Sequence, residues 1–275
     1  MLSTIFDKYN KFLLKLIPEK LDALEKLPFS CNISYNEKTF SLLPTTSEEI
    51  KKILDRVKNK ISSGDDGILS FIVKLCSDDI KDILFYIVNN SFKYGIFPDQ
   101  LKLALIKPIH KKGDSRQMEN YLPISLLPSL SKVFEMAILD RLLKFINDCK
   151  LLSDTQHGFL KGKSTQTAIY KFTETLIHLI EEGKWAMGLF LDLTKAYDCL
   201  FREYILNKLE IMGVRNRALC WFESYLSGRQ QRVALSKQGV EVKSTIETSE
   251  IGVPQGSVLG PILFILFLND VNDCT

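Results

Sequence analysis

The stretch AMGLFLDLTKAYD, at residues 186–198, decides the fold that we expect for this chain. An apolar run ends at Asp192 and predicts a strand, and a helix is expected to follow it through about Met212. A carboxylate at the end of a rigid strand is a common way to hold a divalent cation. The simpler interpretation is that Asp192 or Thr194 caps the next helix, with Asp198 as a solvated charge inside it. Judged from the predicted strand alone, helix capping is favoured over metal binding as the role of Asp192.

The second decisive motif, GVPQGSVLGP, lies at residues 252–261 and leads into the longest apolar stretch of the chain, residues 258–268. Pro254 and Gly260 are typical of a turn ahead of a buried helix. A helix of that length is too short to span a bilayer, so no membrane association is expected. The pattern alone therefore predicts an interior helix that is opened by a turn.

Hydrophobic periodicity and the positions of Gly and Pro predict the remaining helices and strands. The predicted helices cover residues 1–28 with an interruption at Pro18, a segment that begins at the N-cap Ser47, and residues 70–94, 131–149 and 167–182, with a further stretch around Trp221. The predicted strands cover residues 103–110, their hairpin partner 121–127, a segment near Val233, and residues 242–248. Helices and strands intermix without a strict alternation, which favours an α+β fold.

Charge is distributed unevenly along a chain whose net charge is only +3 over 275 residues. Between Lys102 and Lys171 there are twelve Lys and Arg residues and six Asp and Glu residues. A basic middle in a near-neutral chain fits a surface that faces phosphates, although a solvated face is the ordinary explanation of scattered lysines.

The cysteines and histidines indicate no metal or redox chemistry. The six cysteines are widely spaced without a CxxC pair, and the three histidines lie far from them in the sequence. This spacing argues against a structural zinc site, and none of the histidines has the neighbours that a catalytic role needs. Because the N-terminus also lacks the pattern of a secretory signal, we expect an intracellular protein with reduced thiols.

The two motifs, in this order and at this separation, resemble the palm of the reverse transcriptases of LINE-type (non-LTR) retrotransposons, including the jockey-like elements. Further segments match that family in the right order: SGDDGI at 63–68, PIHKKGD at 108–114, NYLPISLL at 120–127, QHGFLKGKST at 156–165 and WFESYLSGRQQRV at 221–233. Several short matches in order are far more specific than any one of them.

The resemblance implies an α+β fold with the fingers and partial palm of a right-hand polymerase. It implies an N-terminal helical extension over residues 1–45, a helical region over 46–100, fingers over 101–185 and a partial palm over 186–275. The implied activity is that of an RNA-directed DNA polymerase, which adds dNTPs to the 3′-OH of a DNA primer on an RNA template. Two Mg²⁺ ions would stabilise the attacking and leaving oxygens of that reaction.

Specific residues take roles from the resemblance. Asp192 would be the catalytic carboxylate and first metal ligand, helped by the backbone carbonyl of Leu193. Tyr197 would lie against the sugar and exclude a 2′-OH, and the alternative is that it is simply a core residue. Gln255 and Gly256 would lie beside the incoming nucleotide, where the amide can bond sugar or phosphate and the glycine allows close approach.

The tip of the predicted hairpin carries three further candidates for nucleotide binding. Lys111, Lys112 and Arg116 would meet the triphosphate there. The plainer interpretation of the two lysines is a solvated hairpin end.

Two features depart from the family pattern. Its third palm motif, an aromatic-x-Asp-Asp hairpin, normally follows soon after the position of Asp270, whereas this sequence ends at Thr275. We therefore expect a truncated, inactive chain without a thumb, whose strand at Asp192 lacks its partner and leaves an aggregation-prone apolar face. In addition, Leu122 replaces the usual Arg, and it cannot make a charge-assisted phosphate contact. Together the departures favour a decayed copy.

Two other functions remain open on the sequence alone. The chain could be a non-catalytic nucleic-acid-binding protein derived from such an element, in which the basic middle holds a duplex by its phosphates. Retention of Asp192 argues slightly against this alternative, because a pure binder gains nothing from a carboxylate near phosphates. The chain could also be an unfolded remnant without activity.

Overall fold

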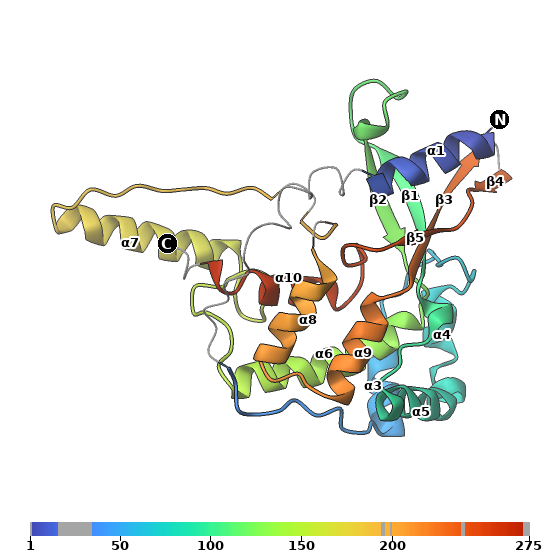
Figure 1. The fold of residues 1–275 in the computed structure, drawn as a ribbon, viewed down its shortest axis with the longest axis horizontal. Helices are drawn as coiled ribbons and strands as arrows, with labels where there is room; N and C mark the ends of the chain where they lie inside the picture. Colours follow the sequence, from blue (N-terminus) through green and yellow to red (C-terminus); the bar gives the residue numbers. More distant parts are fainter. Residues whose placement is uncertain (1, 16–34, 194–195, 199, 238–239, 272–275) are drawn as a thin grey trace.

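The computed structural model describes residues 2–15, 35–193, 196–198, 200–237 and 240–271 (Figure 1). Its α-helices are α1 (Leu2–Lys15), α3 (Ser47–Arg56), α4 (Ser70–Leu75), α5 (Ser77–Tyr94), α6 (Ser131–Asp148), α7 (Thr165–Glu181), α8 (Arg202–Ile211), α9 (Arg217–Leu226) and α10 (Gly260–Phe267). Its strands are β1 (Leu103–His110), β2 (Tyr121–Leu126), β3 (Arg229–Lys237), β4 (Val240–Lys243) and β5 (Glu247–Ser249). Apart from α1, which lies along the sheet, the helices pack mainly on one another, which confirms the predicted α+β class.

The strands form one mixed sheet in the order β2-β1-β3-β4, with β5 also paired to β3. β1 and β2 are antiparallel, with Lys107 opposite Ile124, so the predicted hairpin is confirmed. β1 and β3 are parallel, with Ala104 opposite Gln231, although more than a hundred residues separate them in the sequence. This parallel pair joins the hairpin to the C-terminal half of the chain.

Helix α1 covers the sheet along β3 (Figure 1). The Asn10 amide donates to the Gln231 carbonyl oxygen at 3.4 Å and receives a bond from the Gln231 side chain at 2.8 Å. Tyr9 packs in a small core with Ala104, Ile106 and Val233. The expected N-terminal helix is confirmed as far as Lys15, and residues 16–34, with the interruption predicted at Pro18, lie outside the described residues.

The larger core lies between the helices and is centred on Trp221, which is fully buried. Its indole ring stacks on Tyr225 at 5.4 Å and meets Phe97 edge-on at 5.4 Å. The indole N–H donates to the Ser91 hydroxyl at 2.8 Å. Each aromatic pair stabilises a core by about 1 kcal/mol beyond the area that it buries. These contacts hold α9 against α5. Because β3 follows α9 directly in the sequence, they also fix where β3 starts.

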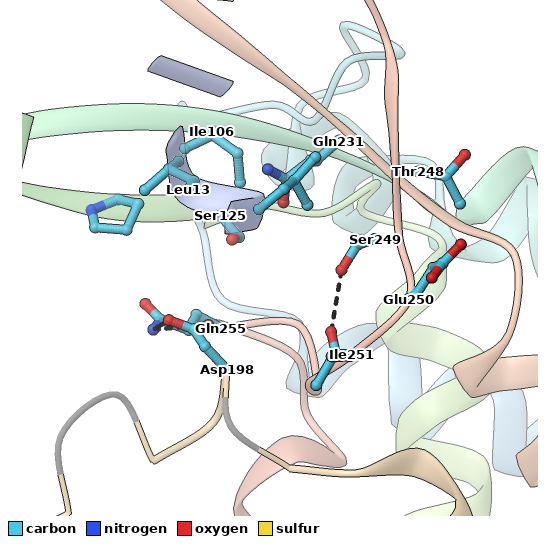
Figure 2. Close-up of a pocket in the computed structure, with 12 residues that line it drawn as sticks. Leu13, Ile106, Ser125, Asp198, Gln231, Thr248, Ser249, Glu250, Ile251 and Gln255 are labelled. Carbon is cyan, nitrogen blue, oxygen red and sulfur yellow. Dashed lines mark hydrogen bonds between the residues drawn. The ribbon is translucent and has the colours of Figure 1, made fainter. Parts of the chain in front are cut away.

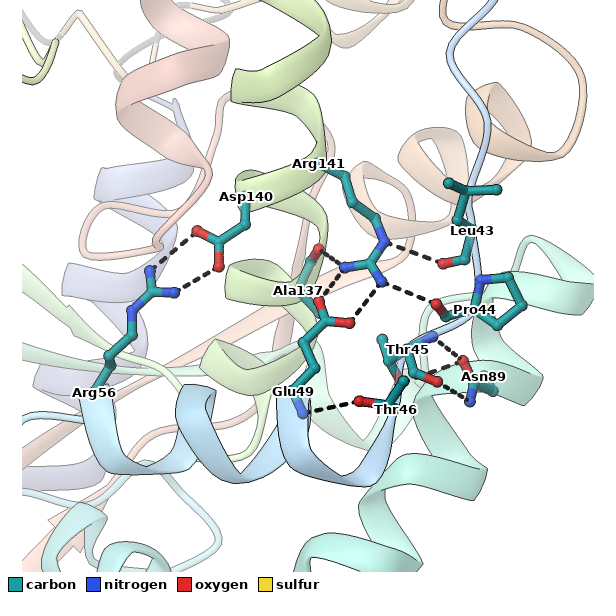
Figure 3. A network of polar contacts seen from close by, with 10 residues as sticks. All are labelled: Leu43, Pro44, Thr45, Thr46, Glu49, Arg56, Asn89, Ala137, Asp140 and Arg141. Atoms are coloured by element: carbon teal, nitrogen blue, oxygen red, sulfur yellow. Dashed lines mark hydrogen bonds and ion pairs between the residues drawn. The ribbon is translucent and has the colours of Figure 1, made fainter.

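A polar network fixes α3 against α6 (Figure 3). Arg141 of α6 makes a two-pronged ion pair with Glu49 and also donates to the carbonyl oxygens of Leu43 and Pro44. The N-cap of α3 is Thr46, whose hydroxyl accepts from the Glu49 N–H at 3.1 Å. The N-cap predicted at Ser47 was therefore wrong by one position, because either hydroxyl could serve in sequence.

Two other helix predictions need correction. The helix predicted over 70–94 is broken at Cys76 into α4 and α5. Asp198 lies in a turn and not inside a helix, and α8 begins only at Arg202. Among the described helices, none is both long and apolar enough to cross a membrane.

The strand predicted to end at Asp192 was wrong. Residues 184–193 run beside α7, away from the sheet, with no ladder to any described strand (Figure 1). Trp185 is 100% exposed and Phe190 81% exposed, with Phe172 of α7 in edge contact with Phe190 at 5.7 Å. A strand exists only where a neighbouring strand pairs with it, and periodicity cannot show whether one is present.

Candidate functional site

The two decisive motifs meet in space. The backbone N–H of Val253 donates to the Tyr197 carbonyl oxygen at 2.9 Å, and that of Gly252 to Leu200 at 2.9 Å. Gly252 has a φ of +83°, and a Cβ atom there would lie 2.9 Å from the Asp198 carbonyl oxygen. The close approach therefore requires glycine. The turn 196–198 and the loop 252–256 form one compact unit.

Asp198 and Gln255 form the polar contact at the centre of this unit. The Gln255 side-chain nitrogen donates to the two carboxylate oxygens of Asp198 at 3.2 and 3.1 Å. These bonds use the Nε2 atom of Gln255, so its side-chain oxygen, Oε1, takes no part in them. Gln255 was predicted as a binding residue, whereas Asp198 was placed inside a helix and was not among the predicted site residues.

A buried acid anchors the other end of the loop. Glu135 of α6 has no exposed surface. Its carboxylate accepts from the backbone N–H groups of Val258 at 2.6 Å and Leu259 at 3.2 Å, and from the Ser131 hydroxyl at 2.6 Å. These N–H groups precede α10, where donors have no partner inside the helix. Glu135 therefore sets where α10 begins and where the loop before it lies.

A groove of about 210 Å³ separates this unit from the sheet (Figure 2). Asp198 and Gln255 lie on one side, and Ser125 and Gln231 of the sheet lie on the other, with Leu13 of α1 beside them. The lining mixes apolar side chains with a few polar groups, as ligand sites usually do. The groove is lined both by the predicted binding loop and by the sheet.

Tyr197 is half-buried. Its ring packs on Phe264 of α10 at 5.4 Å, and burial raises the pKa of its phenol. The residues that line the groove do not include Tyr197. The contact with Phe264 matches the alternative role as a core residue, and the predicted contact with a sugar remains a prediction.

The three cations predicted at the fingers tip are gathered at one end of the β1–β2 hairpin. Lys111, Lys112 and Arg116 are all exposed there. The turn is closed by the Lys111 N–H, which donates to the Asn120 carbonyl oxygen at 2.9 Å. Gly113 holds a φ of +90° in this turn. The three cations do not line the groove. They lie at the tip of the β1–β2 hairpin, and the strands of this hairpin line one side of the groove.

Asp192 and Leu193, the predicted metal ligands, are exposed in the segment beside α7. In the described part of the chain, no three His, Cys, Asp or Glu side chains lie close enough together to hold a metal ion. Mg²⁺ needs several oxygen ligands in near-octahedral geometry. The described residues around Asp192 therefore do not form a two-metal site.

Several residues of the site were missed by the sequence analysis. Arg202 donates to the carbonyl oxygens of Ser249 at 2.6 Å and Gly252 at 3.4 Å, which ties α8 to the loop. Burial, and then the charge of Arg229, lower the pKa of the Arg202 guanidinium to about 10. Glu135 had a signal that could have revealed it, because an acid within the apolar stripe of a predicted helix must be paired when buried.

The comparisons with known proteins show which family the chain belongs to. The family described as reverse transcriptase (RNA-dependent DNA polymerase) matches residues 109–273. The RNA-directed DNA polymerase from mobile element jockey of Drosophila melanogaster is 32% identical over 84% of this chain and 25% of its own length. The probable RNA-directed DNA polymerase from transposon BS of the same species is 29% identical over 98% of this chain and 28% of its own length.

A more distant relative extends the comparison beyond insects. The transposon TX1 uncharacterized 149 kDa protein of Xenopus laevis is 25% identical over 61% of the chain. The chain spans about a quarter of the length of the two Drosophila relatives. The family match covers more than half of the chain and includes both decisive motifs. The chain therefore belongs to the reverse transcriptase family, in the jockey-like, non-LTR branch that its motifs resemble.

Proposed function

We propose that this chain is the nucleotide- and template-facing part of an RNA-directed DNA polymerase, which adds dNTPs to a DNA primer on an RNA template. One observation carries the proposal. The loop 252–256 is bonded to the turn 196–198, and both face the mixed sheet across a groove. A polymerase needs such a junction, because the base pair being formed must be held between the template side and the nucleotide side.

The residues of the junction have separate tasks in this proposal. Asp198 holds the Gln255 amide in one orientation, so the Gln255 oxygen accepts from a sugar hydroxyl of the bound nucleotide. Gly256, at a φ of +92°, lets the backbone come close to the ligand. Tyr197, fixed against Phe264, limits the space near the sugar. Lys111, Lys112 and Arg116 meet the phosphates from the hairpin tip.

The family reaction depends on divalent metal ions, which stabilise charge on the attacking and leaving oxygens. Among the described residues, Asp192 belongs to no group of three His, Cys, Asp or Glu side chains that could hold such an ion. No step of the proposal is therefore routed through the ions. The role of Asp192 and Leu193 as ligands stays a prediction, as do the domain limits at residues 45, 100 and 185.

A second candidate function is non-catalytic binding of an RNA–DNA duplex. The lack of a three-acid cluster among the described residues favours it. Under this alternative, the basic hairpin tip and the groove hold the duplex through its phosphates, and affinity falls steeply with salt.

Primer extension separates the two candidates. The chain is given an RNA template annealed to a DNA primer, with dNTPs and Mg²⁺, and duplex binding is measured in parallel. Asp192→Asn removes an exposed carboxylate charge without disturbing the core, and Asp154→Asn is the matched control at another exposed position.

Extension that Asp192→Asn abolishes and Asp154→Asn retains supports the polymerase. Duplex binding without any extension that depends on Asp192 contradicts catalysis by this chain and supports the second candidate. Absence of both binding and extension contradicts both.

A further inference from the structure

The groove continues into a smaller, basic cavity. This second cavity, of about 60 Å³, shares Ser125, Asp198, Gln231, Ser249, Ile251 and Gln255 with the first. Three cations line it: Lys102 at the start of the sheet, Arg202 of α8 and Arg229 of β3. We call these three residues the basic pocket. Among the residues that line this cavity, Asp198 is the one acidic side chain.

Arg229 is the most informative of the three. It is only 3% exposed, and its guanidinium lies over the ring of Tyr225 at 4.2 Å and that of Phe97 at 5.1 Å. Its Nε donates to the Tyr225 carbonyl oxygen at 2.6 Å. Both terminal nitrogens are buried and, among the described residues, have no hydrogen-bond partner. A buried guanidinium with unsatisfied donors is costly unless an acceptor of opposite charge reaches it.

The other two cations do not supply that acceptor. Arg202 is itself a cation, and the mutual repulsion of the two guanidinium groups is one reason for its lowered pKa. Lys102 is 6% exposed and pairs with Asp99, at 2.7 Å, whose side chain is 86% exposed to solvent. Glu250 lines the first cavity and not the second, although its charge reaches Arg202. The basic pocket therefore keeps an excess of positive charge in a partly enclosed space.

We propose that the basic pocket binds a phosphate group, carried by a nucleotide, by pyrophosphate or by a nucleic-acid strand. The space suffices, because one water needs only about 10–15 Å³ of such volume and a tetrahedral oxyanion needs a few times that. The planar fork of a guanidinium matches phosphate oxygens, and burial strengthens the contact by keeping water away. The pocket is separate from Lys111, Lys112 and Arg116, which lie exposed at the hairpin tip.

The phosphate site goes beyond the proposed function and does not depend on it. A polymerase and a non-catalytic binder could both use it, and its test requires no turnover. Failure of primer extension therefore leaves this proposal intact, and failure of phosphate binding leaves the polymerase proposal intact.

Titration calorimetry of the chain with pyrophosphate, without metal ions, tests the proposal. Wild type should bind it saturably. Arg202→Gln and Lys102→Gln should each weaken binding about tenfold, the effect of losing one charge-assisted contact. Arg202→Lys keeps the charge and should lose less. Arg217→Gln and Lys144→Gln remove the same charges from exposed positions of α9 and α6 and should bind as wild type does.

Thermal unfolding without ligand checks that each variant folds, and Lys102→Gln keeps the test valid if Arg202→Gln does not. No saturable binding by wild type overturns the proposal, as does wild-type affinity in both Lys102→Gln and Arg202→Gln. Titrations with a dNTP and with a short single-stranded RNA then identify the source of the phosphate. The ligand whose affinity falls in the same variants as that of pyrophosphate is the one that occupies the pocket.

Discussion

The side-chain amide of Gln255 donates to both carboxylate oxygens of Asp198, across 57 residues of sequence. The two residues belong to different motifs, and backbone bonds from Gly252 and Val253 join the same two segments. The contact joins the two motifs through their side chains. One carries the glycine loop, and the other carries the acid that orients its amide.

We expect the two residues to be energetically coupled. Asp198→Ala and Gln255→Ala should each lower the free energy of unfolding, and the double variant should lower it by about 1–2 kcal/mol less than the sum, because a bond to a charged group is lost only once. Denaturant unfolding of the four proteins measures this coupling. The pair Asp154→Ala and Gln255→Ala is the control and should be additive. Additivity in the first cycle would contradict an energetic role for the contact.

Glu135 should be the acid whose loss is most damaging to the site. Glu135→Ala leaves the N–H groups of Val258 and Leu259 buried without their acceptor, and we expect a loss of about 3 kcal/mol in the free energy of unfolding. Glu135→Gln keeps an acceptor oxygen and should lose less. Glu223→Ala, at an exposed position of α9, should change stability by under about 0.5 kcal/mol. Equal effects of Glu135→Ala and Glu223→Ala would show that the anchor is unimportant.

The cations at the hairpin tip should determine how strongly salt weakens duplex binding. Each phosphate contact contributes about −0.9 to the slope of log affinity against log salt for duplex DNA. Removing Lys111, Lys112 and Arg116 together, each by substitution with Gln, should make the slope shallower by about 2–3. Fluorescence anisotropy at several salt concentrations measures it. Lys58, Lys60 and Lys93, changed in the same way on the helical side, should leave the slope unaltered, and an equal change in both triple variants would refute a specific role for the tip.

Features that depend on local sequence could be predicted, and those that depend on distant partners could not. The hairpin of β1 and β2 follows from two extended runs around a glycine turn, so it was foreseen. The strand predicted before Asp192 is absent from the described sheet. A strand needs a neighbouring strand to pair with, and periodicity does not reveal whether one is present. The basic pocket could not be foreseen either, since Lys102, Arg202 and Arg229 come from three separate elements. Gln255 was identified by its motif, whereas its partner Asp198 required the structure.

The apolar segment beside α7 should make the chain prone to association. Trp185, Phe190 and Leu191 are each more than 70% exposed, and contiguous exposed apolar surface promotes aggregation. Replacing all three with Ser should reduce aggregation several-fold in light scattering, with little change in the free energy of unfolding. Leu43→Ser, at another exposed apolar position, is the control. Unchanged aggregation in the triple variant would mean that another surface is responsible.

Hydrogen exchange of the backbone amides, with and without a primer–template duplex and a complementary dNTP, tests the central claim most directly, because it locates binding without requiring catalysis. The account predicts slower exchange in the loop 252–256 and in β1 and β2 when both ligands are present. It predicts no change at the exposed surface around Arg217, the first residue of α9. Protection confined to that surface, or absent from the loop under saturating ligand, would contradict the assignment of the groove as the nucleotide site.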